Sequence, residues 1–177
     1  DAIKAIKKLD QVAGGLEYVE QPCKTVEDLR EVRRKVNVPI AADESIRRAA
    51  DPFRVRDLEA ADIAVLKVQP LGGVRACLRI AEQICMPVTV SSAVETSIGL
   101  AASVALAAAL PELPYACGIG TAHLLTADVV AEPLKPVGGC LMVTRPELDE
   151  LAYAKVAAPL EVDERWQARL AHVRERL

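Results

Sequence analysis

The chain has 177 residues, of which 51% are hydrophobic but only 3% aromatic, and its formal net charge is −3 at pH 7. This length suffices for one domain whose core consists mainly of Ala, Val, Leu and Ile. The nearly balanced charge argues against a nucleic-acid-binding surface, and no run of about 18 apolar residues predicts a membrane-spanning helix. We therefore expect neither nucleic acid nor a membrane among its partners.

The cysteines indicate reduced thiols in a cytoplasmic protein, because their number, five, is odd and no CxxC pair occurs. Cys23 and Cys117 fall near the ends of predicted strands and could border a site. Neither is assigned a nucleophile's role, since no histidine in the sequence is suitably placed to activate it.

The chain opens within a predicted helix, because apolar residues recur at helical spacing from residue 3 to residue 9 and Gly14-Gly15 ends the pattern. In a protein built of βα units, a strand normally precedes such a helix. We therefore expect this sequence to be the C-terminal part of a longer polypeptide, with the missing N-terminal half as its partner.

Short apolar runs then alternate with helical patterns. The predicted strands are residues 16–20, 38–42, 63–68 and 88–91, with a weaker fifth at 115–119. The first four end close to Glu20, Asp43, Lys67 and Ser91, which are spaced by 23, 24 and 24 residues. Such a repeat predicts βα units with parallel strands, whose carboxyl ends gather ligands and catalytic groups.

Parallel strands of this kind form either an open doubly wound sheet or part of a closed barrel. No GxGxxG or GxxxxGK[ST] phosphate loop follows the first strand, and functional residues end four successive units. We therefore predict an α/β fold, the C-terminal part of a TIM-like (β/α) barrel with about five βα units, in residues 1–140. Residues 141–177 are predicted to be a helical tail that packs on the barrel or on a cap through Trp166, Leu170, Val173 and Leu177.

Glu20 and Asp43 are expected to project into one pocket from adjacent strands, where two carboxylates repel each other and need a cation. Hard oxygen ligands without His or Cys suit Mg²⁺, with Mn²⁺ as the alternative, rather than zinc. Alone, each carboxylate could instead cap the following helix or pair with an arginine. Glu44 could also be a ligand, but strand alternation directs it away from Asp43.

Lys67 lies in an otherwise apolar strand, where a buried charge is costly without a partner. Beside a divalent cation in a dry pocket its pKa is expected to fall, so that it acts as an acid or base, or stays charged and stabilises an oxyanion. The alternative is a head group that reaches solvent. Metal and lysine together indicate proton abstraction next to a carboxylate.

Ser91 and Ser92 precede a helix whose N-terminus could bind an anion, and residues 118–121 offer further backbone amides, including those of Gly118 and Gly120. Both features suit a small-molecule substrate that carries a carboxylate. The alternative is that they are plain caps and turns.

At these residues the chain resembles the enolase superfamily, in its muconate-lactonizing-enzyme-like branch, over roughly residues 1–140. Within that branch it is most similar to the actinobacterial o-succinylbenzoate synthase family. The motifs that carry the resemblance are YVEQP at 18–22, ADES at 42–45, LKVQPLGG at 66–73 and SSAVETSIG at 91–99.

The resemblance implies that Glu20 and Asp43 are the second and third metal ligands, and that Lys67 is the lysine after the sixth barrel strand. Ser91 and Ser92 would lie near the substrate's succinyl group. The implied reaction is syn dehydration of 2-succinyl-6-hydroxy-2,4-cyclohexadiene-1-carboxylate to o-succinylbenzoate in menaquinone biosynthesis, through a Mg²⁺-stabilised enediolate.

Some features of that family cannot be placed in this sequence: the lysine pair that supplies the general base, the first metal ligand and the capping domain. An N-succinyl amino acid racemase of the same superfamily is an alternative, and so is a non-catalytic half-barrel. A dipeptide epimerase is disfavoured, because residues 118–121 contain no Asp-x-Asp pair. The sequence leaves the oligomeric state open.

Overall fold

The computed structural model describes residues 1–176, and Leu177 of the predicted apolar stripe lies outside them. Its centre is a parallel sheet in the order β1-β2-β3-β4, which confirms the predicted parallel α/β fold. The strands are β1 (Val19–Glu20), β2 (Ile40–Ala42), β3 (Ile63–Lys67) and β4 (Val88–Ser91). The helices are α1 (Ala2–Ala13), α2 (Val26–Arg33), α3 (Asp51–Asp57), α4 (Val74–Ile84), α5 (Ser97–Ala109), the 3₁₀ helix η1 (Thr121–Leu124), α6 (Glu150–Val156) and α7 (Leu160–Arg174).

Local sequence signals account for several helix ends. Gly14 ends α1 in the left-handed conformation, with φ +74°, which costs glycine little. Thr25 caps α2 by accepting the backbone N–H of Asp28 at 3.1 Å, the role that threonine commonly has just before a helix. Pro52 lies in the first turn of α3, where its missing N–H is not needed.

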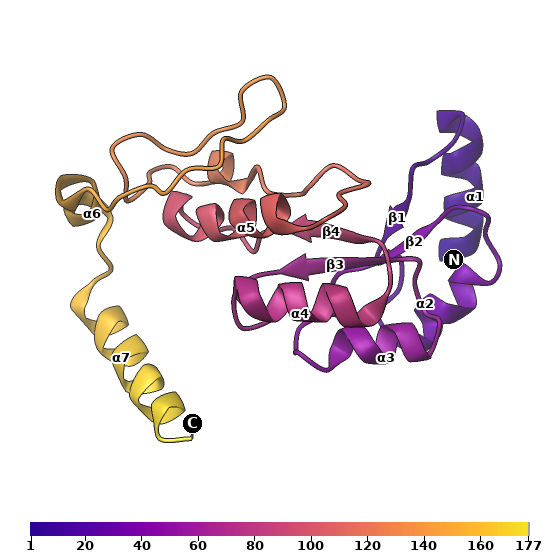
Figure 1. The fold of residues 1–177 in the computed structure, drawn as a ribbon, viewed down its shortest axis with the longest axis horizontal. Coiled ribbons are helices and arrows are strands. Elements are labelled where there is room, and N and C mark those ends of the chain that lie inside the picture. The colour runs from indigo at the N-terminus through magenta and orange to yellow at the C-terminus, as the bar shows by residue number, and fades with distance from the viewer. Residues whose placement is uncertain (177) are drawn as a thin grey trace.

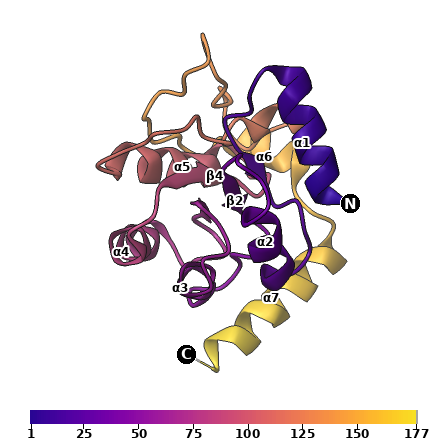
Figure 2. The same ribbon diagram turned by 90° about the vertical axis from the view of Figure 1, so that its right-hand side faces the viewer.

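Helices α2 to α5 cover one face of the sheet as an arc around the strands (Figures 1 and 2). The residues of β2 to β4 that point toward these helices form the main core, including Ile40, Leu66 and Val90, each 0% exposed. The residues between them point the other way, and Ala41, Ile63 and Val65 form a separate small cluster beneath Tyr18 and Tyr115. This period of two decides which strand-end residues share a face.

The fifth predicted strand forms only one bridge, in which Gly118 pairs in parallel with Ser91. The N–H of Gly118 donates to Val90 O at 2.9 Å, and the N–H of Ser92 donates to Gly118 O at 3.2 Å. Pro114 and the glycines at 118 and 120 leave too short a run of strand-forming residues for a longer ladder.

The C-terminal helices α6 and α7 contain no buried residue within the described part of the chain. The predicted stripe on α7 is exposed, with Trp166 at 55%, Leu170 at 44% and Val173 at 45%. Figure 1 shows α7 extending away from the sheet. That this tail packs on the barrel or on a cap therefore stays a prediction.

None of the helices within residues 1–176 has both the length and the apolar character needed to cross a membrane.

Candidate active site

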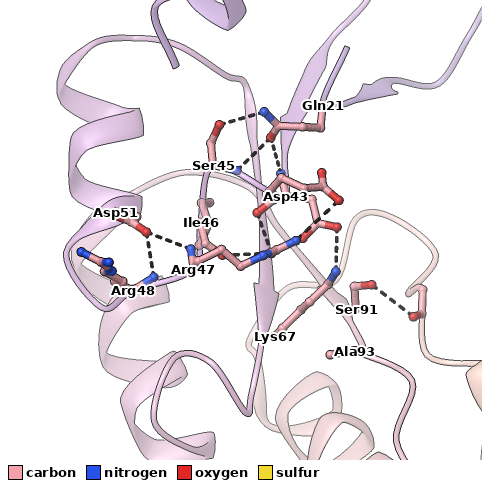
Figure 3. Close-up of polar contacts among 12 residues, drawn as sticks. Gln21, Asp43, Ser45, Ile46, Arg47, Arg48, Asp51, Lys67, Ser91 and Ala93 are labelled. Atoms are coloured by element: carbon pink, nitrogen blue, oxygen red, sulfur yellow. Dashed lines mark hydrogen bonds and ion pairs between the residues drawn. The ribbon is translucent and has the colours of Figure 1, made fainter. Parts of the chain in front are cut away.

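The strand ends bring the predicted residues to one face of the sheet. The four strand-end residues alternate with the main-core residues that point toward helices α2 to α5. They therefore point to the opposite face of the sheet, the inner face, on which Ala41, Ile63 and Val65 lie. The four are Glu20, Asp43, Lys67 and Ser91. Lys67 pairs directly with Ser91 in the β3–β4 ladder, and Glu20 pairs with Ala41, two residues before Asp43. Asp43 and Lys67 meet directly, as Figure 3 shows.

Asp43 is 3% exposed, and each of its carboxylate oxygens has a cationic partner. Lys67 Nζ donates to Oδ2 at 2.7 Å, and Arg47 Nη1 donates to Oδ1 at 2.8 Å (Figure 3). Burial by itself raises the pKa of Asp43, but the hydrogen bonds and positive charges of Arg47 and Lys67 hold that pKa below its ordinary value. Asp43 is therefore an anion held between two cations.

Glu20 lies next to this pair, but its pKa shifts in the opposite direction to that of Asp43. Partial burial and the nearby Asp43 carboxylate raise the pKa of Glu20, and Lys67 offsets only part of this rise. A carboxylate that is destabilised by a second carboxylate favours a cation that both can share. Both side chains offer oxygen donors, the ligand type that suits a hard divalent cation, while Arg47 and Lys67 occupy the Asp43 oxygens here.

Lys67 does not extend into solvent, because its side chain is only 12% exposed and its ammonium group lies on Asp43. The alternative of a solvent-directed head group is therefore wrong. A lysine buried to this degree needs a carboxylate partner. Its ion pair places a fixed positive charge on the inner face of the sheet.

Arg47 was not predicted as a site residue, although pairing with an arginine was an alternative for either carboxylate. Besides Oδ1, its Nη1 donates to the backbone oxygen of Asp43 at 2.9 Å. Asp51 accepts the N–H groups of Arg47 and Arg48 and thereby fixes this loop ahead of α3. No local pattern in the sequence marked Arg47, because a spacing of four indicates a side-chain pair only within a helix and residues 43–47 are not helical.

The two serines have different surroundings. The Ser91 hydroxyl donates to Gly118 O at 3.3 Å and is partly exposed on the inner face. Ser92 is 5% exposed, donates to Gly118 O at 3.2 Å and shares a hydrogen bond of 2.8 Å with Thr121 Oγ1. Ser92 thus ties the end of β4 to the loop that contains Gly118 and Gly120. A substrate-binding role for these four residues stays a prediction.

Glycine at 118 has a steric reason, because a Cβ atom there would lie 3.0 Å from Ser91 Oγ. That contact is tighter than ordinary packing allows. A larger residue at this position would therefore require Ser91 or the loop to shift by a few tenths of an ångström.

The N-terminus of α5 differs from the open anion site that the sequence suggested. Asp128 is 9% exposed, and both its oxygens accept the Ser97 N–H at 3.1 Å. It also accepts the Ser97 hydroxyl at 2.6 Å and the Val129 N–H at 2.7 Å. This carboxylate caps the helix from 31 residues away. The sequence could not show it, because only the fold brings these segments together.

Replacing Asp128 by alanine is expected to lower the free energy of unfolding of the full-length protein by about 1–3 kcal/mol, because buried N–H and O–H donors lose their acceptor. Urea denaturation measures the change. Glu164→Ala, on an exposed turn of α7, is the control and should stay within about 0.5 kcal/mol of the original protein. Equal stability of the two variants would show that the cap contributes nothing.

Within residues 1–176, no group of three or more His, Cys, Asp or Glu side chains could hold a metal ion. That Glu20 and Asp43 bind a metal ion therefore stays a prediction.

Comparisons with known proteins identify the family of the chain. Residues 1–148 match the family described as enolase C-terminal domain-like. An o-succinylbenzoate synthase from Thermobifida fusca is 65% identical over 174 residues, which is 98% of this chain and 53% of that protein. One from Mycobacterium bovis is 55% identical over 86% of this chain and 47% of its own length. The chain therefore spans about half the length of the curated relatives it matches.

Solved structures give the same result. A muconate lactonizing enzyme from Pseudomonas putida has a TM-score of 0.76 at 30% identity, covering 88% of this chain and 46% of that one. The L-Ala-D/L-Glu epimerase from Bacillus subtilis has a TM-score of 0.72 at 26% identity, covering 83% and 42%. The predicted C-terminal barrel part is confirmed. The chain belongs to the enolase C-terminal domain-like family.

Proposed function

We propose that the chain is the C-terminal part of an o-succinylbenzoate synthase, which dehydrates 2-succinyl-6-hydroxy-2,4-cyclohexadiene-1-carboxylate to o-succinylbenzoate for menaquinone biosynthesis in the cytoplasm. The observation that carries the proposal is the Lys67–Asp43 ion pair beside Glu20, at the carboxyl ends of adjacent parallel strands. The relatives at 65% and 55% identity support this substrate over others.

Glu20 and Asp43 are the residues that would hold a divalent cation, and membership of the family implies dependence on such an ion. We propose Mg²⁺, with Mn²⁺ as the alternative. When bound, the ion would neutralise the negative charge that develops on the substrate carboxylate as the adjacent proton leaves. Asp43 would then exchange at least one of its present partners, Lys67 and Arg47, for the ion.

Lys67 would supply positive charge on one face of the substrate ring. On the other face, the general base would remove the substrate proton next to the carboxylate. The protonated general base would return that proton to the ring hydroxyl, which leaves as water from the same face and completes the aromatic ring, so dehydration needs no second proton acceptor. Ser91 and Ser92, with the backbone at Gly118 and Gly120, would contact the succinyl group. Ser91 is the better placed of the two serines, because its hydroxyl is partly exposed.

The general base and a further metal ligand would come from the missing N-terminal half of the polypeptide. Residues 1–140 would form the barrel part that carries the site, and residues 141–177 would pack on the barrel or cap. The exposed apolar stripe of α7 supports such packing. Residues 1–177 alone are therefore expected to be inactive.

The test is product formation by the full-length protein. With Mg²⁺ present it should form o-succinylbenzoate, and EDTA should abolish turnover until Mg²⁺ is restored. Racemisation of an N-succinyl amino acid, followed by polarimetry in the same preparation, should be slower. Racemisation without dehydration would favour the racemase, and neither activity in a folded, metal-loaded protein would favour a non-catalytic half-barrel.

A further inference from the structure

Gln21, the residue after Glu20, uses the full hydrogen-bonding capacity of its side-chain amide. Oε1 accepts the Asp43 N–H at 3.0 Å and the Ser45 N–H at 3.1 Å, and Nε2 donates to Ser45 Oγ at 2.8 Å (Figure 3). Nε2 also donates to Cys23 O at 2.8 Å. An amide side chain has two donor hydrogens and two acceptor sites, so none is left over. This one side chain joins the loops that follow β1 and β2.

The backbone at Gln21 explains how the side chain reaches that position. Its N–H donates to Ala41 O at 2.9 Å, the last backbone rung between the two strands. Its φ is +39°, a conformation that non-glycine residues seldom adopt. The main chain therefore turns away from the sheet here, and the side chain continues the cross-strand contacts toward Asp43 and Ser45. Strain of this kind persists only where surrounding contacts over-determine it.

Gln21 connects the two residues that bear the carboxylates. Gln21 is covalently attached to Glu20, and its Oε1 holds the backbone of Asp43. The end of β1, which bears Glu20, and the loop that bears Asp43 cannot shift along each other without breaking these contacts. In metal sites, groups that orient the ligands without touching the ion typically control affinity or activity by 10- to 100-fold, at the order-of-magnitude level.

We propose that Gln21 is a positioning residue, which sets the spacing of the Glu20 and Asp43 carboxylates and thereby the affinity of the site for a divalent cation. The proposal rests on the metal site of the proposed function, and extends it to a residue that touches neither substrate nor ion.

The test compares Gln21→Met with Gln69→Met in the full-length protein. Methionine keeps the length of the glutamine side chain but removes all four hydrogen bonds. Gln69 is exposed, and its amide donates only to Gly99 O, at 3.2 Å, away from both loops. The first readout is hydrogen exchange of the metal-free protein, in a peptide that covers residues 41–47. Exchange of the Asp43 and Ser45 amides should accelerate by roughly tenfold or more in Gln21→Met and remain unchanged in Gln69→Met.

The second readout is the Kd of Mn²⁺ alone, measured by calorimetry without substrate. It should rise by about 10- to 100-fold in Gln21→Met and stay within about twofold in the Gln69 control. A residue that only stabilises the fold would lower the melting temperature and leave the Kd unchanged. Unchanged Mn²⁺ affinity in a folded Gln21→Met protein would overturn the proposal.

Should Gln21→Met fail to fold, Gln21→Asn retains an amide that is one methylene too short to span both loops, and the same rise in Kd is expected. Neither readout needs catalysis, so a protein that forms no o-succinylbenzoate would still support or refute the positioning role. An original protein that binds no Mn²⁺ would refute the metal site and this proposal together.

Discussion

Replacing Lys67 by methionine in the full-length protein is expected to slow dehydration by about 10²- to 10³-fold, the cost typical of losing one preorganised charge partner of a developing anion. Lys67→Arg should retain far more activity, because arginine keeps the positive charge. The structure motivates this expectation, since the Lys67 side chain is 12% exposed and its ammonium group is held 2.7 Å from Asp43. The measurement is the steady-state rate of o-succinylbenzoate formation in both variants.

Any racemisation of an N-succinyl amino acid should respond differently. One face of that substrate must lose a proton and the other must gain one, and arginine does not exchange protons near neutral pH. Lys67→Arg should therefore lose about 10²- to 10⁴-fold in racemisation. Equal losses of the two activities, with normal substrate and metal binding, would show that Lys67 has no separable electrostatic role.

The variant Asp43→Asn is expected to weaken Mg²⁺ binding by about tenfold or more, because an amide lacks the charge that a hard divalent cation prefers. It also leaves Lys67 and Arg47 facing a neutral group. Calorimetry on the full-length protein measures the affinity. Glu44→Gln is the matched control, because Glu44 is adjacent but exposed and should leave the affinity within about twofold. If Asp43→Asn bound Mg²⁺ as well as the original protein, Asp43 would not be a ligand.

The position of the site could be predicted because it depends on two local regularities. The spacing of 23 or 24 residues predicted successive βα units. The period of two along each strand predicted to which face of the sheet each side chain points. Glu20, Asp43, Lys67 and Ser91 therefore reach one edge of the sheet on one side. Gly14 at the end of α1 and Thr25 at the start of α2 are likewise local signals.

Contacts between residues far apart in the sequence could not be predicted from these local regularities. Asp128 caps α5 across 31 residues, and Gln21 reaches Ser45 across 24. Neither residue type is unusual where it stands, and only the assembled sheet brings the partners together. The weak fifth strand failed for a different reason: near Gly118 too few strand-forming residues remain to extend a ladder beyond one bridge.

The carboxylates also show that a sequence motif does not reveal which side chains contact it in the folded protein. The motif around Asp43 predicted an acid at a strand end, but the alternatives of metal ligand and arginine partner were both left open. The structure places Arg47 and Lys67 on its two oxygens. An anion between two cations can be held for catalysis or for stability, and metal binding distinguishes these roles.

The most direct measurement is therefore a crystal structure of the full-length protein with Mn²⁺, in which anomalous scattering locates the ion. We expect one Mn²⁺ peak bound by the carboxylates of Glu20 and Asp43, with Asp43 released from Lys67 or Arg47. A peak elsewhere, or no peak while Asp43 keeps both cationic partners, would contradict the account.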